Sequence, residues 1–421
     1  MSYNKKLTIG LFGYGVVGEA VFQVLAGTPS LNAVVKKICI KNQQKKRNIA
    51  PSHFTDDKNI LLNDPGINVI IEVIDDATAS FEIVRAALSR GKAVITANKK
   101  MVAENLSELI ALQQKHGVPV LYESACCASI PVVRNLEEYY DNDLLKGIEG
   151  IINGSTNFIL SRMFDANEDY HSALSSAKKK GFAESDPHLD VSGRDAANKL
   201  CILLAHAYGI LAKPEDLLYG GIAALKPADA EVAAAQNCHV KLVARAIKLD
   251  HGEVVAFVLP QFVKSDHLLF NVKNEFNGVV LASTLADEQF FYGKGAGGFP
   301  TASAILSDLS ALRYDYKYEY KKLLQQAPAL LCDDVLLNVY VSFDRWEKLP
   351  VDAMEEVSEY YSGHQFHYRK GTVSLAKLRQ ESWWKEEGVS LILCENAVVG
   401  SGTRVAESKE GEKTPALVSV V

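Results

Sequence analysis

A polar passage near the middle of the chain gathers side chains that can take part in proton transfer. From Gly181 to Leu200 the sequence reads Gly-Phe-Ala-Glu-Ser-Asp-Pro-His-Leu-Asp-Val-Ser-Gly-Arg-Asp-Ala-Ala-Asn-Lys-Leu. Carboxylates and lysines serve enzymes as general acids and bases, so the passage is a candidate active site. The alternative is a solvated loop followed by an ordinary ion pair on a helix, which contributes only about 0.2–0.5 kcal/mol.

A helix is expected to position two of these groups. Ser192 is the expected N-cap, with Asp195 three residues later, an arrangement close to a capping box. Apolar residues at helical spacing follow, namely Ala197, Leu200, Cys201, Leu204 and Ala205. Asp195 and Lys199 should therefore lie one turn apart on the same side of the helix, with Glu184 and Asp190 in the loop that leads into it.

The composition is that of a globular protein with several domains. A chain of 421 residues, 48% of them hydrophobic, can bury two or three cores. A net charge of −6 argues against a general nucleic-acid surface, and no apolar run reaches the roughly 18–20 residues that cross a bilayer. The seven cysteines are scattered without metal-binding spacing, and the N-terminus does not resemble a signal peptide. We expect reduced thiols, a cytoplasmic location, and neither nucleic acid nor a membrane as partner.

The N-terminal segment has the order of a dinucleotide-binding motif. Leu7 to Phe12 reads as a strand, Gly13-Tyr-Gly15-Val-Val-Gly18 follows directly, and a helical pattern comes next. In such motifs the first glycine permits a tight turn, the second lets the backbone approach the pyrophosphate, and the third allows close helix packing. A purely structural turn is the alternative. The residues expected to meet the cofactor are Phe12, Gly13, Gly15, Val16, Val17 and Gly18.

The residues after the second expected strand, Ala33 to Ile40, bear on the choice of cofactor. NAD enzymes commonly place an acid there for the ribose, whereas this chain has Lys41 and the basic run Lys45-Lys-Arg47. A basic loop suits a 2′-phosphate and favours NADP, with NAD or a merely solvated loop as alternatives. Further along, Asp75-Asp76 would be unfavourable beside an anionic cofactor unless these acids face solvent or cap the next helix.

The pattern then continues as alternating strands and helices. Val69 to Ile74 and Ala93 to Thr96 read as buried strands around a helix at Ser80 to Arg90. Such alternation predicts a doubly wound parallel sheet of Rossmann type, with ligands at the carboxyl ends of its strands. Lys99 follows one of those ends, so it is placed to contact cofactor or substrate.

With these motifs the chain resembles the homoserine dehydrogenases. Members of this family are NAD(P)-dependent enzymes that interconvert aspartate 4-semialdehyde and homoserine in threonine, methionine and isoleucine synthesis. The resemblance runs from Leu7 to about Leu312. Its motifs, in family order, are Gly13-x-Gly15-x-x-Gly18, Thr96-Ala-Asn-Lys99, Asn153-Gly-Ser-Thr-Asn157, the Gly181 to Leu200 passage, and Gly295-Ala-Gly-Gly-Phe-Pro-Thr-Ala-Ser303.

The resemblance implies a role for each candidate residue. Lys199 would be the catalytic acid/base, assisted by Asp195, and Lys99 would lie between nicotinamide and substrate. A carbonyl that takes up hydride develops alkoxide character, and a lysine supplies both positive charge and a proton. The implied substrate-binding residues are Glu184, Asp190 and Thr156, and Gly297 would add a further cofactor contact.

The family also holds a monovalent cation such as Na⁺, mainly through main-chain oxygens of a loop. The segment Glu123 to Pro131 corresponds to that loop, and carbonyl oxygens suit a hard cation. The implied ligands are Glu123, Cys126, Ala128 and Ile130. A plain turn between a strand and a helix is the alternative, because Cys126-Cys127-Ala128-Ser129 stands where the family has small, glycine-rich residues.

The resemblance implies a domain order as well. Residues 1–135 would form the Rossmann domain, completed by a helix at 301–325, and residues 136–300 an α+β substrate-binding and dimerisation domain that makes a homodimer or homotetramer. Residues 328–402 have the element order of a small α+β ACT-like domain, with a strand at Leu336 to Phe343, a helix at Val351 to Tyr361 and a strand at Ser390 to Leu393. Residues 403–421 would be a flexible tail. No kinase-like region precedes the first strand, which implies a monofunctional enzyme.

Two questions stay open at this point. The C-terminal region lacks the Asp-x-Pro-Gly signature of ACT domains, so loss of amino-acid sensing is our first interpretation and feedback by threonine the second. The chain as a whole is interpreted as an enzyme acting on a small molecule. The alternatives are a dinucleotide-sensing paralogue without turnover and another two-domain dehydrogenase.

Overall fold

The computed structural model describes residues 5–142, 144–166, 168–325 and 328–399, without the side chains of 395–397 and 399. The chain divides into two units. The first comprises Met1–Asp143, Cys201–Lys213 and Gly293–Pro328, and the second comprises Leu144–Leu200, Pro214–Tyr292 and Ala329–Val421. The tail predicted to be flexible, 403–421, lies outside the described residues.

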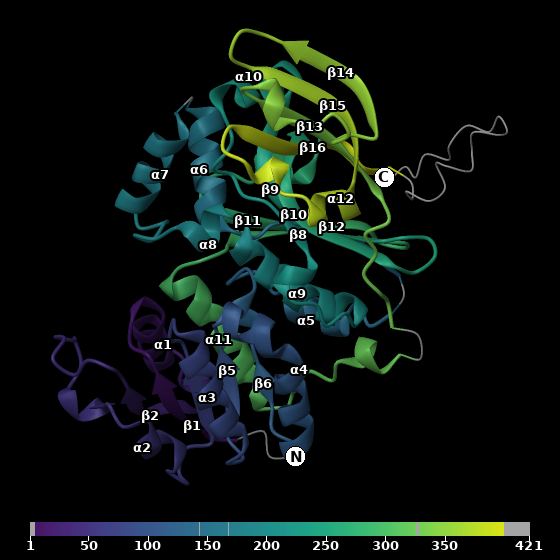
Figure 1. The fold of residues 1–421 in the computed structure, drawn as a ribbon. Helices are drawn as coiled ribbons and strands as arrows, with labels where there is room; N and C mark the ends of the chain where they lie inside the picture. The colour runs from purple at the N-terminus through teal and green to yellow at the C-terminus, as the bar shows by residue number, and fades with distance from the viewer. Residues whose placement is uncertain (1–4, 143, 167, 326–327, 400–421) are drawn as a thin grey trace. The chain divides into compact units, whose positions relative to one another are not determined.

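The first unit is built on a parallel sheet with the order β3-β2-β1-β4-β5-β6. Its strands are β1 Leu7–Phe12, β2 Ala33–Cys39, β3 Phe54–Thr55, β4 Val69–Glu72, β5 Ala93–Thr96 and β6 Val120–Leu121. Its helices are α1 Val16–Ala26, α2 Lys58–Leu62, α3 Ala77–Leu88, α4 Lys99–His116, α5 Val132–Glu138 and α11 Gly298–Leu312 (Figure 1). Every residue of β4 is buried, as expected for a parallel strand covered on both faces. The predicted Rossmann-type sheet is confirmed.

Helix α11 brings a late segment of the chain back to this unit. It packs closely on the start of α1, because a Cβ added at Gly298 would lie 2.8 Å from the carbonyl oxygen of Val16. The helix is shorter than the predicted 301–325, since it ends at Leu312. Asp315 and Tyr320 then have left-handed φ values of 58° and 51°, which do not continue an α-helix.

The second unit contains a mixed sheet with the order β12-β11-β7-β9-β10-β16-β13-β15-β14, and β8 pairs with β10. Its strands are β7 Leu145–Ile151, β8 Leu218–Tyr219, β9 Cys238–Lys248, β10 Val254–Lys264, β11 Phe276–Ser283, β12 Asp287–Lys294, β13 Leu336–Phe343, β14 Glu356–Ser362, β15 His367–Ser374 and β16 Val389–Val399. Its helices include α6 Gly154–Asp165, α7 Tyr170–Lys179, α8 His188–Val191, α10 Pro227–Ala235 and α12 Leu375–Gln380. Helix α9, Arg194–Tyr208, begins in this unit and continues into the first. The sheet confirms an α+β architecture here.

The C-terminal part of the sheet corrects one predicted element. The helix expected at Val351 to Tyr361 is instead a turn at 351–353 followed by the strand β14, and a 3-10 turn at Trp346–Lys348 precedes both. Valine and tyrosine favour strands, and β14 lies at the sheet edge with all of its residues exposed, so no buried helical stripe exists. The order is therefore strand, turn, strand, strand, helix, strand; the ACT-like character of the region stays a prediction.

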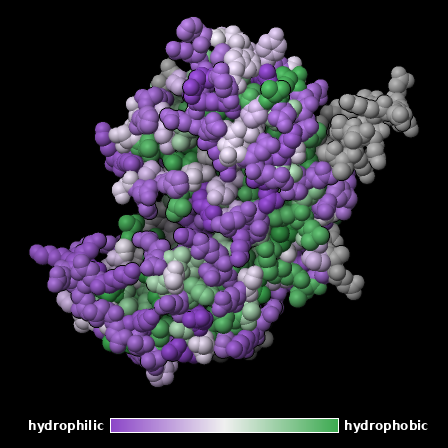
Figure 2. Space-filling model, in the orientation of Figure 1, coloured by the Kyte–Doolittle hydropathy of each residue, from purple (hydrophilic) through white to green (hydrophobic). Residues whose placement is uncertain are grey.

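The visible surface is mostly hydrophilic, with hydrophobic residues in scattered patches (Figure 2). Among the described residues, no helix combines the length and apolar content needed to cross a membrane.

Candidate active site

The junction between β7 and α6 is the centre of a buried polar cluster in the second unit. Asn153 caps α6: its Oδ1 accepts hydrogen bonds from the Thr156 backbone N–H at 2.8 Å and from the Thr156 hydroxyl at 2.9 Å. The next position, 154, needs glycine, because a Cβ there would lie only 2.7 Å from the carbonyl oxygen of Glu275. The strand end is thus fixed in position and direction.

The amide nitrogen of Asn153 holds two carboxylates at once. Asn153 Nδ2 donates to Asp190 Oδ1 at 2.7 Å and to Asp195 Oδ2 at 2.8 Å. Asn153 is only 5% exposed. Because it is neutral, it connects the two acids without adding charge.

Lys199 completes the cluster from one turn further along α9. Its Nζ lies 2.8 Å from Asp195 Oδ2 and donates to the Ile152 carbonyl oxygen at 2.6 Å. Lys199 is 6% exposed and Asp195 2%. The predicted spacing of these two residues is confirmed, and the pair is buried, unlike the ordinary surface ion pair considered as the alternative.

The loop before α9 differs from the expected capping arrangement. Ser192 is the C-cap of α8, and its hydroxyl donates to the Leu189 carbonyl at 3.4 Å, so its predicted role as N-cap of the next helix is wrong. Helix α9 begins only at Arg194. Gly193 turns the chain between them with a φ of 84°, and a Cβ there would meet the Gly220 carbonyl oxygen at 2.6 Å. The close contact with Gly220 therefore requires glycine at position 193, directly after the residue that was predicted to be the N-cap.

The three candidate substrate-binding residues differ in their burial and in their contact with Asn153. Thr156 is buried, and its hydroxyl is bonded to Asn153. Glu184 is exposed on the loop between α7 and α8, and among the described residues no hydrogen bond or ion pair joins it to the cluster. Asp190 is half-buried beside Asn153.

The glycine turn in the first unit has the geometry that a dinucleotide needs. Gly13 has a φ of 98°, and a Cβ there would meet the Val73 carbonyl oxygen at 2.8 Å. A Cβ at Gly18 would lie 2.3 Å from the Gly13 carbonyl oxygen, whereas nothing lies within 4 Å of one at Gly15. The turn is tight at the first glycine, open at the second and closely packed at the third, so it fits a bound pyrophosphate.

The remaining candidate cofactor residues flank helix starts. Phe12 is buried at the end of β1, while Val16 and the half-buried Val17 begin α1. Lys99 opens α4 directly after its N-cap Asn98. Gly297 is the N-cap of α11 with a φ of 114°.

Near the second strand, Lys41 and Asp76 neighbour one another. Lys41 Nζ lies 3.7 Å from Asp76 Oδ2, and the Lys41 side chain is 81% exposed. Asp76 caps α3 by accepting from the Ala79 backbone N–H at 3.0 Å, and this hydrogen bond, more than the nearby lysine, lowers the pKa of its carboxyl. Asp76 therefore caps the following helix, which is one of the two arrangements that we expected to make an acid tolerable beside an anionic cofactor.

The expected cation loop is strained, and its four candidate ligands are buried. Both carboxylate oxygens of Glu123 accept backbone N–H groups at the start of α5, from Val133 and Arg134 at 2.9 Å each. Burial raises the pKa of this carboxyl, while those hydrogen bonds oppose the rise. Cys127 and Ala128 have left-handed φ values of 55° and 40°. The side chain of Glu123 is committed to α5, which leaves main-chain oxygens as the donors that a cation would find.

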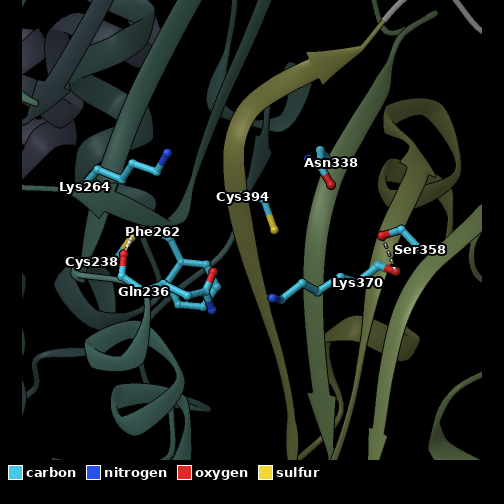
Figure 3. A pocket seen from close by; sticks show the side chains of 8 residues that line it. All are labelled: Gln236, Cys238, Phe262, Lys264, Asn338, Ser358, Lys370 and Cys394. Atoms are coloured by element: carbon cyan, nitrogen blue, oxygen red, sulfur yellow. Dashed lines mark hydrogen bonds between the residues drawn. The ribbon is translucent and has the colours of Figure 1, made fainter.

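A separate cavity lies in the second unit, away from these candidates. It has a volume of about 260 Å³ and opens between β9 and β10 on one side and the C-terminal strands on the other (Figure 3). Its lining includes Cys238, Phe262, Lys264, Asn338, Lys370 and Cys394. None of the candidate catalytic or substrate residues lines it.

Comparison with known proteins bears on both units. The family model for the NAD-binding domain of homoserine dehydrogenase matches residues 13–123, and the homoserine dehydrogenase model matches residues 131–310. The enzymes named homoserine dehydrogenase from Helicobacter pylori and Mycobacterium tuberculosis H37Rv are 33% and 35% identical to this chain, each over 73% of it, and the matches cover 73% and 72% of those proteins. The chain belongs to the homoserine dehydrogenase family.

Solved homoserine dehydrogenases share the fold. The crystal structure from Thiobacillus denitrificans has a TM-score of 0.81 at 27% identity and covers 93% of this chain and 98% of that one. A hyperthermophilic archaeal homoserine dehydrogenase in complex with NADPH has a TM-score of 0.63 at 27% identity and covers 75% and 99%. The predicted oxidoreductase is confirmed, and the alternative of a regulatory paralogue without turnover finds no support.

Sequence reasoning did not assign a role to Asn153 in this homoserine dehydrogenase. A partial signal was present, because asparagine is a favoured N-cap residue. Nothing local, however, indicated that its amide also binds Asp190 and Asp195, which lie far along the chain.

We predict that Asn153→Ala lowers kcat/KM for the semialdehyde by roughly 10- to 100-fold, because hydrogen bonds to charged groups contribute about 1.5–3 kcal/mol. Steady-state NADPH oxidation would measure it. Asp169→Ala, which removes the N-cap of α7, is the matched control and should cost about 1 kcal/mol of stability with kcat/KM retained. Equal kinetic losses in both variants would assign Asn153 a capping role alone.

Proposed function

We propose that this homoserine dehydrogenase reduces L-aspartate 4-semialdehyde to L-homoserine reversibly, with Lys199 as the proton donor. The observation that carries the proposal is the buried Asp195–Lys199 pair, with Lys199 also bonded to the Ile152 carbonyl. When bound, the nicotinamide supplies or accepts the hydride. Lys199 offers positive charge and a proton to the oxygen that becomes an alkoxide, and Asp195 fixes the direction of its ammonium group.

The acids are proposed to recognise the amino group of the substrate. An ammonium is best bound by carboxylates, and Asp190 is presented at the cluster by Asn153. Glu184 would join as a second acid from its exposed loop, and Thr156 would position the backbone at the start of α6. Lys99 is proposed as a second lysine that contacts cofactor and substrate.

We predict that Lys199→Ala lowers kcat by about 10²- to 10⁴-fold, the usual contribution of general acid–base catalysis. Semialdehyde-dependent NADPH oxidation would be measured alongside thermal unfolding. Lys146→Ala removes an exposed lysine of β7 and should leave turnover unchanged. A folded Lys199→Ala enzyme with parental kcat would refute the role of Lys199. A folded parent without semialdehyde-dependent oxidation would refute the proposed reaction itself.

For the cofactor, we propose a preference for NADP. The exposed Lys41 follows β2, where a 2′-phosphate would need a cation, and no acid takes the ribose position in the sequence. The archaeal relative in complex with NADPH is consistent with this preference. Asp76, 3.7 Å from Lys41, moderates the local positive charge.

We predict that Lys41→Ala raises KM for NADPH by roughly tenfold or more, since a charge-assisted hydrogen bond contributes about 1.5–3 kcal/mol. KM for NADH should stay the same, because NADH has no 2′-phosphate. Lys58→Ala, which removes another exposed lysine of the first unit, serves as the control. Parallel increases for both cofactors would contradict a 2′-phosphate contact.

We also propose a monovalent cation, Na⁺, bound by main-chain oxygens of Glu123, Cys126, Ala128 and Ile130. Two consecutive non-glycine residues with left-handed φ cost about 1–3 kcal/mol each. Such strain persists where something stabilises the loop, and carbonyl oxygens suit a hard cation.

We predict that replacing Na⁺ and K⁺ by choline at constant ionic strength lowers both the thermal midpoint and kcat, and that added Na⁺ restores them. Ala128→Gly should lose less stability in choline than the parent does, because glycine adopts a left-handed φ without strain. Identical behaviour of the parent in choline and Na⁺ would rule the cation out.

The remaining proposals concern assembly, location and the C-terminal region. A homodimer, or a homotetramer built from it, would form through the second unit, where edge strand β12 exposes Phe290 and Tyr292. A cytoplasmic location is supported by seven cysteines that are present as reduced thiols. The C-terminal region is proposed to be an ACT-like module that has lost amino-acid sensing, with threonine feedback as the alternative.

A further inference from the structure

A second group of potential ligands lies at the turn between β9 and β10, remote in sequence from the catalytic candidates. A nitrogen of His251, a carboxylate oxygen of Glu253 and the Sγ of Cys332 all lie within 4.8 Å of one another. His251 Nε2 and Glu253 Oε2 are 2.8 Å apart. Imidazole, carboxylate and thiolate are donors that Zn²⁺ accepts together.

The backbone holds the two segments that carry these donors. In the turn, the Leu249 N–H donates to the Glu253 carbonyl at 2.8 Å and the Gly252 N–H to the Leu249 carbonyl at 2.9 Å. Gly252 has a φ of 94°, so the turn can be tight and present His251 and Glu253 together. The backbone of a short hairpin therefore carries both donors, whose side chains are 57% and 41% exposed.

Cys332 comes from the segment that leads into β13. Its N–H donates to the Val254 carbonyl at 2.9 Å, and the Val254 N–H donates to the Leu330 carbonyl at 2.8 Å. The thiol is half-buried, and its Sγ lies within 4.8 Å of the ligand atoms of both His251 and Glu253. The two backbone hydrogen bonds place this thiol beside the donors of the hairpin.

We propose that His251, Glu253 and Cys332 bind a divalent ion of zinc type, with water completing a tetrahedral site. Ligand atoms of a tetrahedral Zn²⁺ lie about 3.5 Å apart. His251 Nε2 and Glu253 Oε2, which are 2.8 Å apart, therefore need to open slightly, and atoms as far apart as 4.8 Å need to close by about 1.3 Å. Binding releases the thiol proton and forms the metal–sulfur bond without redox change. The ion would fasten the entry to β13 onto the β9–β10 hairpin, and so join the C-terminal strands to the central strands of the second unit.

The test uses the full-length chain, freed of metal by a chelator and then titrated with Co²⁺. We expect about one Co²⁺ per chain with a thiolate-to-cobalt charge-transfer absorption, which Zn²⁺ displaces. Cys332→Ser should abolish that absorption. His251→Ala should weaken binding by about tenfold or more, since even the loss of an outer partner costs 10- to 100-fold. Zn²⁺ should also raise the thermal midpoint of the parent and not that of Cys332→Ser.

Cys394→Ser is the matched control, because Cys394 is another half-buried thiol of the same unit; its absorption and affinity should equal those of the parent. The proposal is overturned if the parent shows no thiolate absorption, or if Cys332→Ser retains it. Turnover of the semialdehyde is not a readout, so failure here leaves the proposed dehydrogenase function untouched.

Discussion

The buried ion pair between Asp195 and Lys199 is the interaction on which the candidate site depends. Removing each charge from water costs several kcal/mol, and their attraction offsets that cost only if the remaining hydrogen-bonding capacity is also satisfied. Asp195 accepts from Asn153, and Lys199 donates to the Ile152 carbonyl. Both compensating groups stand at the end of β7, so the strand end, the cap of α6 and the first turn of α9 are fixed by one another.

The first unit uses a similar arrangement at its own strand ends. Glu72, fully buried at the end of β4, accepts hydrogen bonds from the hydroxyls of Thr96 and Ser80 and from the Ile74 N–H. Burial raises the pKa of Glu72, and those hydrogen bonds limit the rise. They tie the carboxyl ends of β4 and β5 to the start of α3, the edge at which a parallel sheet binds its ligand. In both units, a buried carboxylate that accepts hydrogen bonds ties neighbouring elements together at the candidate site.

How much the sequence revealed depended on whether a feature is local. Strands β1, β5 and β13 were predicted residue for residue, because buried apolar runs bounded by polar residues are local signals, and the spacing of Asp195 and Lys199 follows from helix geometry alone. The end of α8 at Ser192 and the turn at Gly193 were missed, since the glycine is required by a distant neighbour, the Gly220 carbonyl. Strand β14 was missed because an exposed edge strand has no buried face to set a period. The two hydrogen bonds from Asn153 to Asp190 and Asp195 likewise depend on tertiary structure, because these acids are distant in sequence.

The charge balance of the cluster explains why a neutral side chain stands at its centre. Asp190 and Asp195 both accept from Asn153, and only Asp195 pairs with Lys199, so the cluster carries an excess of one negative charge when all three groups are ionised. A lysine at position 153 would cancel that excess and compete with the ammonium of an amino-acid substrate. An aspartate there would add a third carboxylate at hydrogen-bond distance, and like charges so close raise the pKa of one another. A neutral amide donates to both acids and leaves the negative charge available for a cationic substrate group.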